Sequence, residues 1–137
     1  MPDSKPLSPL VSAASQLRAE DMSVLAAEGF TSIINNRPDD EEPGQPSSAE
    51  MEAAAVAAGL SYLHAPVRGM PDQQAVASVA ERLASESDSG GRTLMFCRSG
   101  MRSTVAWALA RRQEDADPDS LREAAAAAGY DLSRLPL

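Results

Sequence analysis

Apolar and polar positions along the chain alternate between short strand-like runs and longer stretches with helical spacing. Between residues 73 and 87, Val76, Val79 and Leu83 recur three or four positions apart, which predicts a helix with one buried face. Residues 93–96 form a short apolar run that is typical of a central strand covered on both faces. The same reasoning predicts strands at 31–35 and 61–64 and helices at 18–28, 48–58, 103–112 and 121–128.

Capping signals support several of these boundaries. Ser47 is followed by Glu50, and Ser120 by Glu123, at the spacing of a capping box, and Asp72 stands where it can cap the next helix. Strands separated by helices indicate the α/β class, with a mostly parallel sheet covered by helices on both sides.

Composition narrows the range of functions. The chain has 137 residues, which suits one domain over residues 1–137, and its 20 acidic against 12 basic residues give a net charge of −8. Such acidity argues against nucleic-acid or membrane-surface binding. One cysteine and one histidine cannot form an internal disulfide or a usual zinc site. Glycine-rich nucleotide-binding motifs are also missing, so we expect no metal and no cofactor.

Neither end of the chain nor its interior shows a targeting or membrane-spanning signal. The first ten residues lack the apolar run of a secretion signal, and nothing later approaches the roughly 18 apolar residues that span a bilayer. We therefore expect a cytoplasmic protein, in which the single thiol stays reduced.

The chemistry of the sequence is concentrated in the Cys loop, Cys97-Arg-Ser-Gly-Met-Arg-Ser103, which joins the strand at 93–96 to the next helix. In parallel sheets, ligands gather where strands end and helices begin, and inward-turned backbone N–H groups can hold an anion there. We predict that Cys97 is the nucleophile and that Arg102 clamps an oxyanion through paired N–H bonds. The predicted anion-binding residues are Arg98, Ser99, Gly100, Met101 and Ser103.

A second interpretation of Cys97 is a small buried residue after a core strand, as free cysteines usually are. A core residue, however, needs neither the glycine three positions later nor the arginines one and five positions later. A helix N-terminus and Arg102 both favour a thiolate. Ser99 and Ser103 could donate hydrogen bonds to the sulfur, with Ser103 also capping its helix, and Arg98 could equally be a solvated rim residue.

The Cys loop resembles the active-site loop of single-domain rhodaneses and is similar to the phosphate-binding loop of tyrosine and dual-specificity phosphatases. Together with Gly29–Glu42 and Gly59–Val67, it resembles the phosphatase-like domain found beside bacterial beta-lactamase-like hydrolases, over about residues 10–135. The resemblance implies a cysteine-phosphatase-like fold, with a parallel sheet of four or five strands flanked by helices. Members of that family are described as phosphatases or as sulfurtransferases, so the reaction stays open.

Three departures from the phosphatase pattern favour sulfur transfer. Four residues separate Cys97 from Arg102 where those phosphatases have five, Phe96 stands where they have histidine, and Asp72 is the only acid near the expected proton-donor position. Asp72 also fits better as a helix cap. The sequence thus favours a sulfurtransferase with a persulfide on Cys97, a small anionic sulfur donor and a sulfur-metabolism enzyme as candidate partner.

Two alternatives remain open. The first is a phosphomonoester phosphatase with a phosphocysteine intermediate, in which Asp72 or an acid of the run 39–42 donates the proton. The second is a non-catalytic anion-binding module. Arg37, Asp39 and Asp40 could shape the mouth of the site, although such a charged run is usually solvated, and His64 is expected to be structural.

Overall fold

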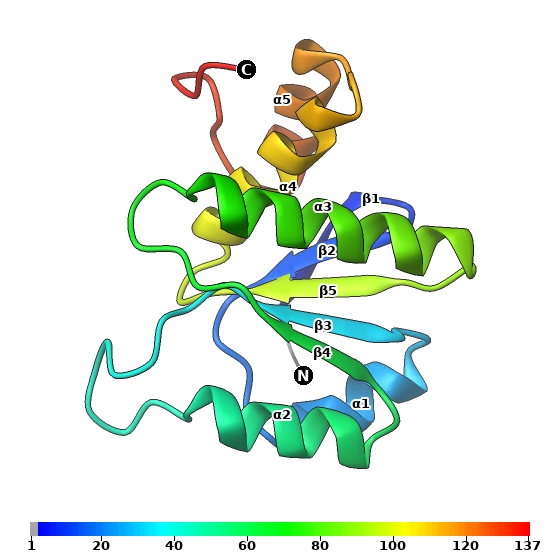
Figure 1. The fold of residues 1–137 in the computed structure, drawn as a ribbon, viewed down its shortest axis with the longest axis vertical. Coiled ribbons are helices and arrows are strands. Elements are labelled where there is room, and N and C mark those ends of the chain that lie inside the picture. The colour runs from blue at the N-terminus through cyan, green and yellow to red at the C-terminus, as the bar shows by residue number, and fades with distance from the viewer. Residues whose placement is uncertain (1–2) are drawn as a thin grey trace.

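The computed structural model describes residues 3–137, which form one five-stranded sheet and five helices (Figure 1). The strands are β1 (Ser4–Ser8), β2 (Val11–Ala14), β3 (Ser32–Asn35), β4 (Ser61–His64) and β5 (Thr93–Phe96). The helices are α1 (Asp21–Ala27), α2 (Ser48–Ala57), α3 (Gln73–Asp88), α4 (Met101–Gln113) and α5 (Pro118–Ala127). Over these residues, none of the helices has the length and apolar character needed to cross a membrane.

The strand order is β1-β2-β5-β3-β4, and every pair is parallel except β1 with β2. Phe96 at the end of β5 pairs with Ala14 on one side and with Asn35 on the other, and Asn35 pairs in turn with His64. Four parallel strands therefore end level with one another. Their last residues open onto the same edge of the sheet, where Cys97 follows β5.

Helices cover both faces of the sheet, as the alternating pattern predicts. Figure 1 shows α3, α4 and α5 on one face and α1 and α2 on the other. The larger core, beneath α3 to α5, includes Ile34, Met95 and Trp107, and the smaller one includes Met22, Ile33 and Phe96. Alternate residues of one strand thus supply opposite cores, which is why β5 reads as an apolar run.

Several predicted boundaries are confirmed. The strands at 61–64 and 93–96 have the expected bounds. Ser47 caps α2 through a complete capping box with Glu50, and the Asp72 side chain accepts a hydrogen bond from the backbone N–H of Ala75 at the start of α3.

Three helix starts differ from the prediction. Helix α1 begins at Asp21, three residues after the predicted start. Helix α4 begins at Met101 with Gly100 as its N-cap, so Ser103 lies inside the helix and does not cap it. Helix α5 is capped by Asp117, whose carboxylate accepts a hydrogen bond from the N–H of Ser120, so the proposed capping box at Ser120 is wrong. A proline at the first position of α5 fixes its start two residues before that serine.

Strands β1 and β2 carry no clear sequence signal. The four positions of β2 are all buried, yet two are alanines and one is a serine, so Val11 is the single residue of the β-branched and aromatic kind that marks a strand. Strand β1 is an edge strand that contains a proline and mostly polar residues. The resulting sheet is mixed, with one antiparallel strand added at the edge of four parallel strands.

Candidate active site

The sulfur of Cys97 lies beneath the Cys loop at the carboxyl edge of the central strand. Cys97 is fully buried, and the backbone N–H of Gly100 donates a hydrogen bond to its sulfur at 3.1 Å. The backbone N–H of Cys97 itself points back to the carbonyl of Ala14 on β2. Burial alone would fit a small core residue, but a loop amide aimed at the sulfur fits a nucleophile whose developing charge is stabilised.

Gly100 makes this arrangement possible. Its φ is 96°, in the left-handed region that residues with a Cβ avoid, and it joins the loop directly to α4. Its carbonyl accepts hydrogen bonds from both the backbone N–H and the hydroxyl of Thr104, at 3.0 and 2.8 Å. A Cβ at Gly100 would also collide with the hydroxyl of Tyr130, so two independent constraints require glycine here.

Other amides of the Cys loop remain available to a ligand. Among residues 3–137, no acceptor takes the backbone N–H groups of Arg98, Ser99, Arg102 or Ser103, whereas that of Met101 donates to the hydroxyl of Ser99. Converging free N–H groups at a helix start are suited to an oxyanion.

The two serine hydroxyls do not bond to the sulfur, contrary to the expectation from sequence. Ser103 is fully buried and donates to Asn36 Oδ1 at 2.8 Å, while Asn36 Nδ2 donates to the carbonyl of Ala65. Ser99 instead accepts a hydrogen bond from the N–H of Met101. Ser103 therefore ties α4 to the segments after β3 and β4, and Ser99 stabilises the turn of the loop.

Arg102 lies in the site with its guanidinium tightly held. One terminal nitrogen donates to Glu41 Oε2 at 2.8 Å and to the carbonyl of Val67 at 2.9 Å, and the other donates to Glu41 Oε1 at 2.8 Å. These bonds with Glu41, followed by the neighbouring Cys97 sulfur, raise the pKa of Arg102 above its already high usual value. The cation is thus permanently charged beside the sulfur.

A second arginine, Arg37, contacts the Glu41 carboxylate of this ion pair. Arg37 is only 1% exposed, and its guanidinium donates to Glu41, to Glu42 and to Gln16 at 2.9–3.0 Å. Glu42 also lies 3.7 Å from Arg98, whose side chain is 69% exposed. The loop between β3 and α2 is therefore fastened to the Cys loop through alternating charges, with Arg98 at the solvated rim.

The two arginines act on the ionisation of Glu41. Hydrogen bonds from Arg102 first, and from Arg37 to a smaller extent, lower the pKa of Glu41 to about 2 despite partial desolvation. Glu41 is therefore a carboxylate throughout the physiological pH range.

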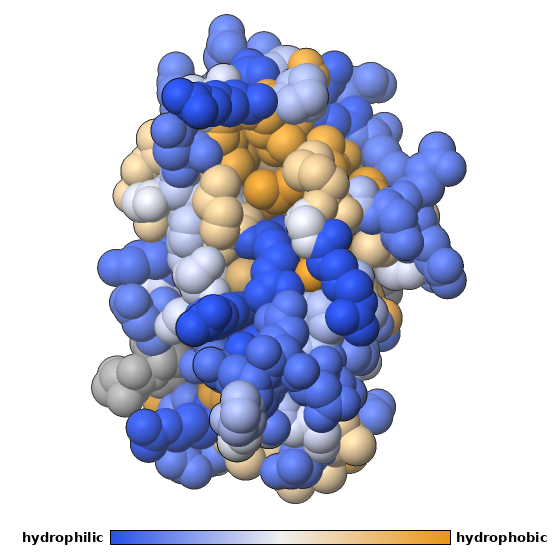
Figure 2. Space-filling model, turned by 90° about the vertical axis from the view of Figure 1, so that its left-hand side faces the viewer, coloured by the Kyte–Doolittle hydropathy of each residue, from blue (hydrophilic) through white to orange (hydrophobic). Residues whose placement is uncertain are grey.

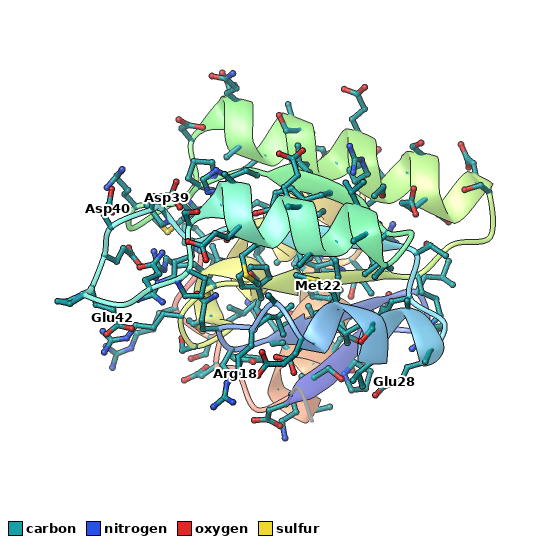
Figure 3. The ribbon with its side chains drawn as sticks, turned by 90° about the horizontal axis from the view of Figure 1, so that it is seen from below. Arg18, Met22, Glu28, Asp39, Asp40 and Glu42 are labelled. Atoms are coloured by element: carbon teal, nitrogen blue, oxygen red, sulfur yellow. The ribbon has the colours of Figure 1, made fainter. Side chains whose placement is uncertain are left out.

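The remaining acids near the site have mainly structural roles. Figure 3 labels Asp39, Asp40 and Glu42 along the loop between β3 and α2, on the opposite side of the view from Glu28, which follows α1. Asp39 and Asp40 are exposed, and Asp39 accepts a hydrogen bond from the N–H of Ser48. Solvated positions are what the charged run predicted for these two aspartates.

His64 and Asp72 also have bonding partners away from the sulfur. The Nε2 of His64 lies 2.9 Å from the carbonyl of Arg37, which fits the structural role expected for it. Asp72 is exposed and uses its Oδ1 to accept the N–H of Ala75 at 2.8 Å. The Asp72 carboxylate is thus used to cap α3.

Figure 2 shows the face of the molecule onto which these loops open. Polar residues cover its lower half, on the side of α2, and apolar residues gather in its upper half, on the side of α4 and α5. The partly buried apolar residues that pack against the larger core include Met101, Tyr130 and Leu135. The Cys loop thus lies where a charged surface meets an apolar one.

Sequence reasoning missed Tyr130 and did not foresee how Arg37 and Glu41 act, since it placed Arg37 at the mouth of the site and Glu41 in the acidic run 39–42. Arg37 and Glu41 belong to a charged run that looks solvated, and only the level ends of the parallel strands bring them to the Cys loop. Tyr130 follows the last helix, and its hydroxyl donates to the carbonyl of Ser99 at 3.3 Å. No sequence signal connects a tyrosine 31 residues away to the loop.

Comparison with known proteins places the chain in a family. The profile of the beta-lactamase hydrolase-like protein phosphatase-like domain matches residues 3–114, which include every strand and the Cys loop. The chain belongs to this family. The segment with α5 and Tyr130 lies beyond the matched residues.

Curated relatives of this phosphatase-like domain are longer proteins. A beta-lactamase hydrolase-like protein of Agrobacterium fabrum is 38% identical over 96 residues, which are 70% of this chain and 22% of the relative. One from Xylella fastidiosa is 36% identical over 110 residues, 80% of this chain and 25% of the relative. The chain thus spans about a quarter of the length of these relatives.

Solved structures show the same architecture. A Neisseria meningitidis protein described as a "putative phosphatase" has a TM-score of 0.76 and 29% identity, over 93% of this chain and 89% of that one. Human DUSP28 has a TM-score of 0.65 and 19% identity, over 93% and 82% of the two chains. These similarities establish the cysteine-phosphatase fold.

Replacing Gly100 by alanine should destabilise the domain more than the same change at Gly59. Both glycines have a positive φ, which costs an alanine about 1–2 kcal/mol, but only Gly100 faces a neighbour, Tyr130. We expect Gly100→Ala to lower the free energy of unfolding by about 1–3 kcal/mol more than Gly59→Ala, measured in urea. Equal losses would show that Tyr130 does not constrain the loop.

Replacing Glu41 by glutamine should reduce the acid sensitivity of the fold. The pKa of Glu41 is lowered from 4.5 to about 2 by folding, so its stabilising contribution is complete above pH 4.5 and is lost as the pH falls toward 2. Between about pH 5 and pH 2.5, the free energy of unfolding should fall less steeply in Glu41→Gln than in wild type. Parallel slopes in urea titrations would contradict the pairing with Arg102.

Proposed function

We propose that this domain is a cysteine-dependent phosphatase that acts on phosphate monoesters. The family match and the cysteine-phosphatase fold support hydrolysis better than the sulfur transfer that the sequence favoured. The observation that carries the proposal is the Gly100 N–H, 3.1 Å from the Cys97 sulfur, in a loop whose other end holds Arg102. A nucleophile, a bound cation and free amides together meet the needs of phosphoryl transfer.

The reaction proceeds through two displacements. The Cys97 sulfur attacks phosphorus, a P–S bond forms, and the ester P–O bond breaks as the alcohol or phenol leaves. Water then attacks phosphorus, so that a new P–O bond forms and the P–S bond breaks. Inorganic phosphate is released, and the Cys97 sulfur is restored. Free N–H groups of the loop, including those of Arg98 and Ser99, stabilise the phosphoryl oxygens, and the guanidinium of Arg102 neutralises their charge.

Proton donation to the leaving group is the weak element of this site. Arg68 directly follows Val67 where an acid is expected, and Asp72 is used as the cap of α3. An alkoxide leaves poorly without a proton, whereas a phenolate needs less assistance. We therefore propose aryl phosphates as better substrates than alkyl phosphates.

Sulfur transfer is a second candidate because of the length of the Cys loop. Four residues separate Cys97 from Arg102, so the ring of amides is smaller than in phosphatases whose loop has five residues between its cysteine and arginine. A persulfide occupies less space than a phosphoryl group. In this reaction the Cys97 sulfur attacks the outer sulfur of a donor such as thiosulfate. The S–S bond breaks, sulfite leaves, and a thiol acceptor later takes the transferred sulfur.

The covalent adduct distinguishes the two reactions. The intact chain is incubated with an aryl phosphate or with thiosulfate, quenched rapidly and weighed by mass spectrometry, with Cys97→Ser as control. We expect a phosphoryl adduct and released phosphate, both absent in Cys97→Ser. A sulfur adduct alone would support the second candidate, and turnover by Cys97→Ser would exclude Cys97 as the nucleophile.

Changing Asp72 to asparagine tests its role as a cap. Asparagine caps helices as well as aspartate does, so stability and kcat on an aryl phosphate should both stay within about twofold of wild type. A general acid would instead contribute about a hundredfold or more to kcat. A loss of that size, with the fold intact by circular dichroism, would assign proton donation to Asp72.

A further inference from the structure

One peptide unit of the Cys loop carries the hydrogen bond to the sulfur. The N–H of Gly100 donates to the Cys97 sulfur at 3.1 Å, and the carbonyl of Ser99 belongs to the same peptide unit. The peptide bonds of the described residues are all trans, so this carbonyl and this N–H point in opposite directions. A group that holds the Ser99 carbonyl in place therefore also holds the Gly100 N–H on the sulfur.

The group that holds the Ser99 carbonyl is the hydroxyl of Tyr130. This hydroxyl donates a hydrogen bond to the carbonyl at 3.3 Å, and among residues 3–137 the carbonyl accepts from no other group. The same hydroxyl lies where it would meet a Cβ at Gly100. It thus contacts the peptide unit at its carbonyl and packs beside the residue that follows.

We propose that Tyr130 is a positioning residue that keeps the Gly100 N–H on the Cys97 sulfur and strengthens that hydrogen bond. The hydroxyl donates to the carbonyl of the peptide unit, and the N–H of the same unit donates to the sulfur. Donation to a peptide carbonyl polarises the N–H at the other end of the unit, so its bond to a charged sulfur becomes stronger. This inference rests on the proposed function, since it takes Cys97 as the nucleophile.

The chain after α5 keeps Tyr130 in place. The backbone N–H of Tyr130 donates to the carbonyl of Ala125 at 2.8 Å, and the residue packs partly buried against the larger core. Leu132, two residues later, is buried in the same core. Tyr130 is therefore anchored independently of the Cys loop, in a part of the chain beyond the residues 3–114 that match the family.

The hydroxyl of Tyr130 stays protonated, and so remains a donor, when the sulfur is charged. Burial first, and then the charges of Cys97 and Asp3, raise the pKa of Tyr130 above its usual value. Arg102 is the other described group whose charge interacts with the sulfur. A cation from α4 and a neutral donor from the segment after α5 thus lie near Cys97.

The direct test is the rate at which iodoacetamide alkylates Cys97 in the full chain, measured between about pH 5 and pH 9. Tyr130→Phe removes the hydroxyl and keeps the ring. The thiolate, which is the reacting form, is then stabilised less, so the pH of half-maximal rate should rise and the rate below it should fall about threefold. The plateau at high pH should stay at or slightly above that of wild type, since a less stabilised thiolate is the better nucleophile.

Tyr62→Phe is the matched control, because the Tyr62 hydroxyl bonds to Asn35 and Ser48 and not to the Cys loop. It should keep the wild-type pH profile. An unchanged profile in Tyr130→Phe, or an equal shift in Tyr62→Phe, would overturn the proposal. A change in rate that is the same at every pH would also overturn it, because altered access to the sulfur has that effect.

The alkylation rate separates this proposal from the proposed function, because it needs no phosphate ester. If Tyr130→Phe shifts the profile while the wild-type chain hydrolyses no aryl phosphate, the positioning role holds and the proposed function fails. If the wild-type chain hydrolyses the ester while the profile of Tyr130→Phe is unchanged, the proposed function holds and the positioning role fails.

Discussion

The left-handed backbone at Gly100 is the constraint on which the site depends. The N–H of Gly100 donates a hydrogen bond to the Cys97 sulfur, and its carbonyl accepts one from the hydroxyl of Thr104. Gly100 is also the N-cap of α4. The level ends of β2, β5 and β3 place that turn at the open edge of the sheet. A fully buried sulfur thereby acquires a polar partner that a cysteine in an ordinary core would lack.

Charge organises the rest of the site. Alternating charges link the loop between β3 and α2 to the Cys loop, in the order Arg37, Glu41 and Arg102. Arg37 is buried and donates hydrogen bonds to Glu41, Gln16 and Glu42, which hold its guanidinium in one place. Glu41 and Arg102 are partly exposed to solvent. The guanidinium of Arg102 is therefore held at the Cys loop by an internal carboxylate.

The sequence predicted most of the fold because its central strands and its longest helix have clear patterns. The run at 93–96 and the spacing of Val76, Val79 and Leu83 correspond to β5 and α3. The small residues of β2 gave no such signal. In the site, local motifs identified Cys97 and Arg102, but the pairing with Glu41 joins residues 61 positions apart, and a charged run does not reveal its partner.

The central claim is that the Cys loop forms an anion-binding ring around the sulfur. A crystal structure of Cys97→Ser grown with tungstate, an analogue of phosphate, tests it most directly. We predict the anion within the loop, bound by the backbone N–H groups of Arg98, Ser99 and Ser103 and by the guanidinium of Arg102. A loop that stays empty at saturating tungstate, or an anion bound only elsewhere on the surface, would contradict the account.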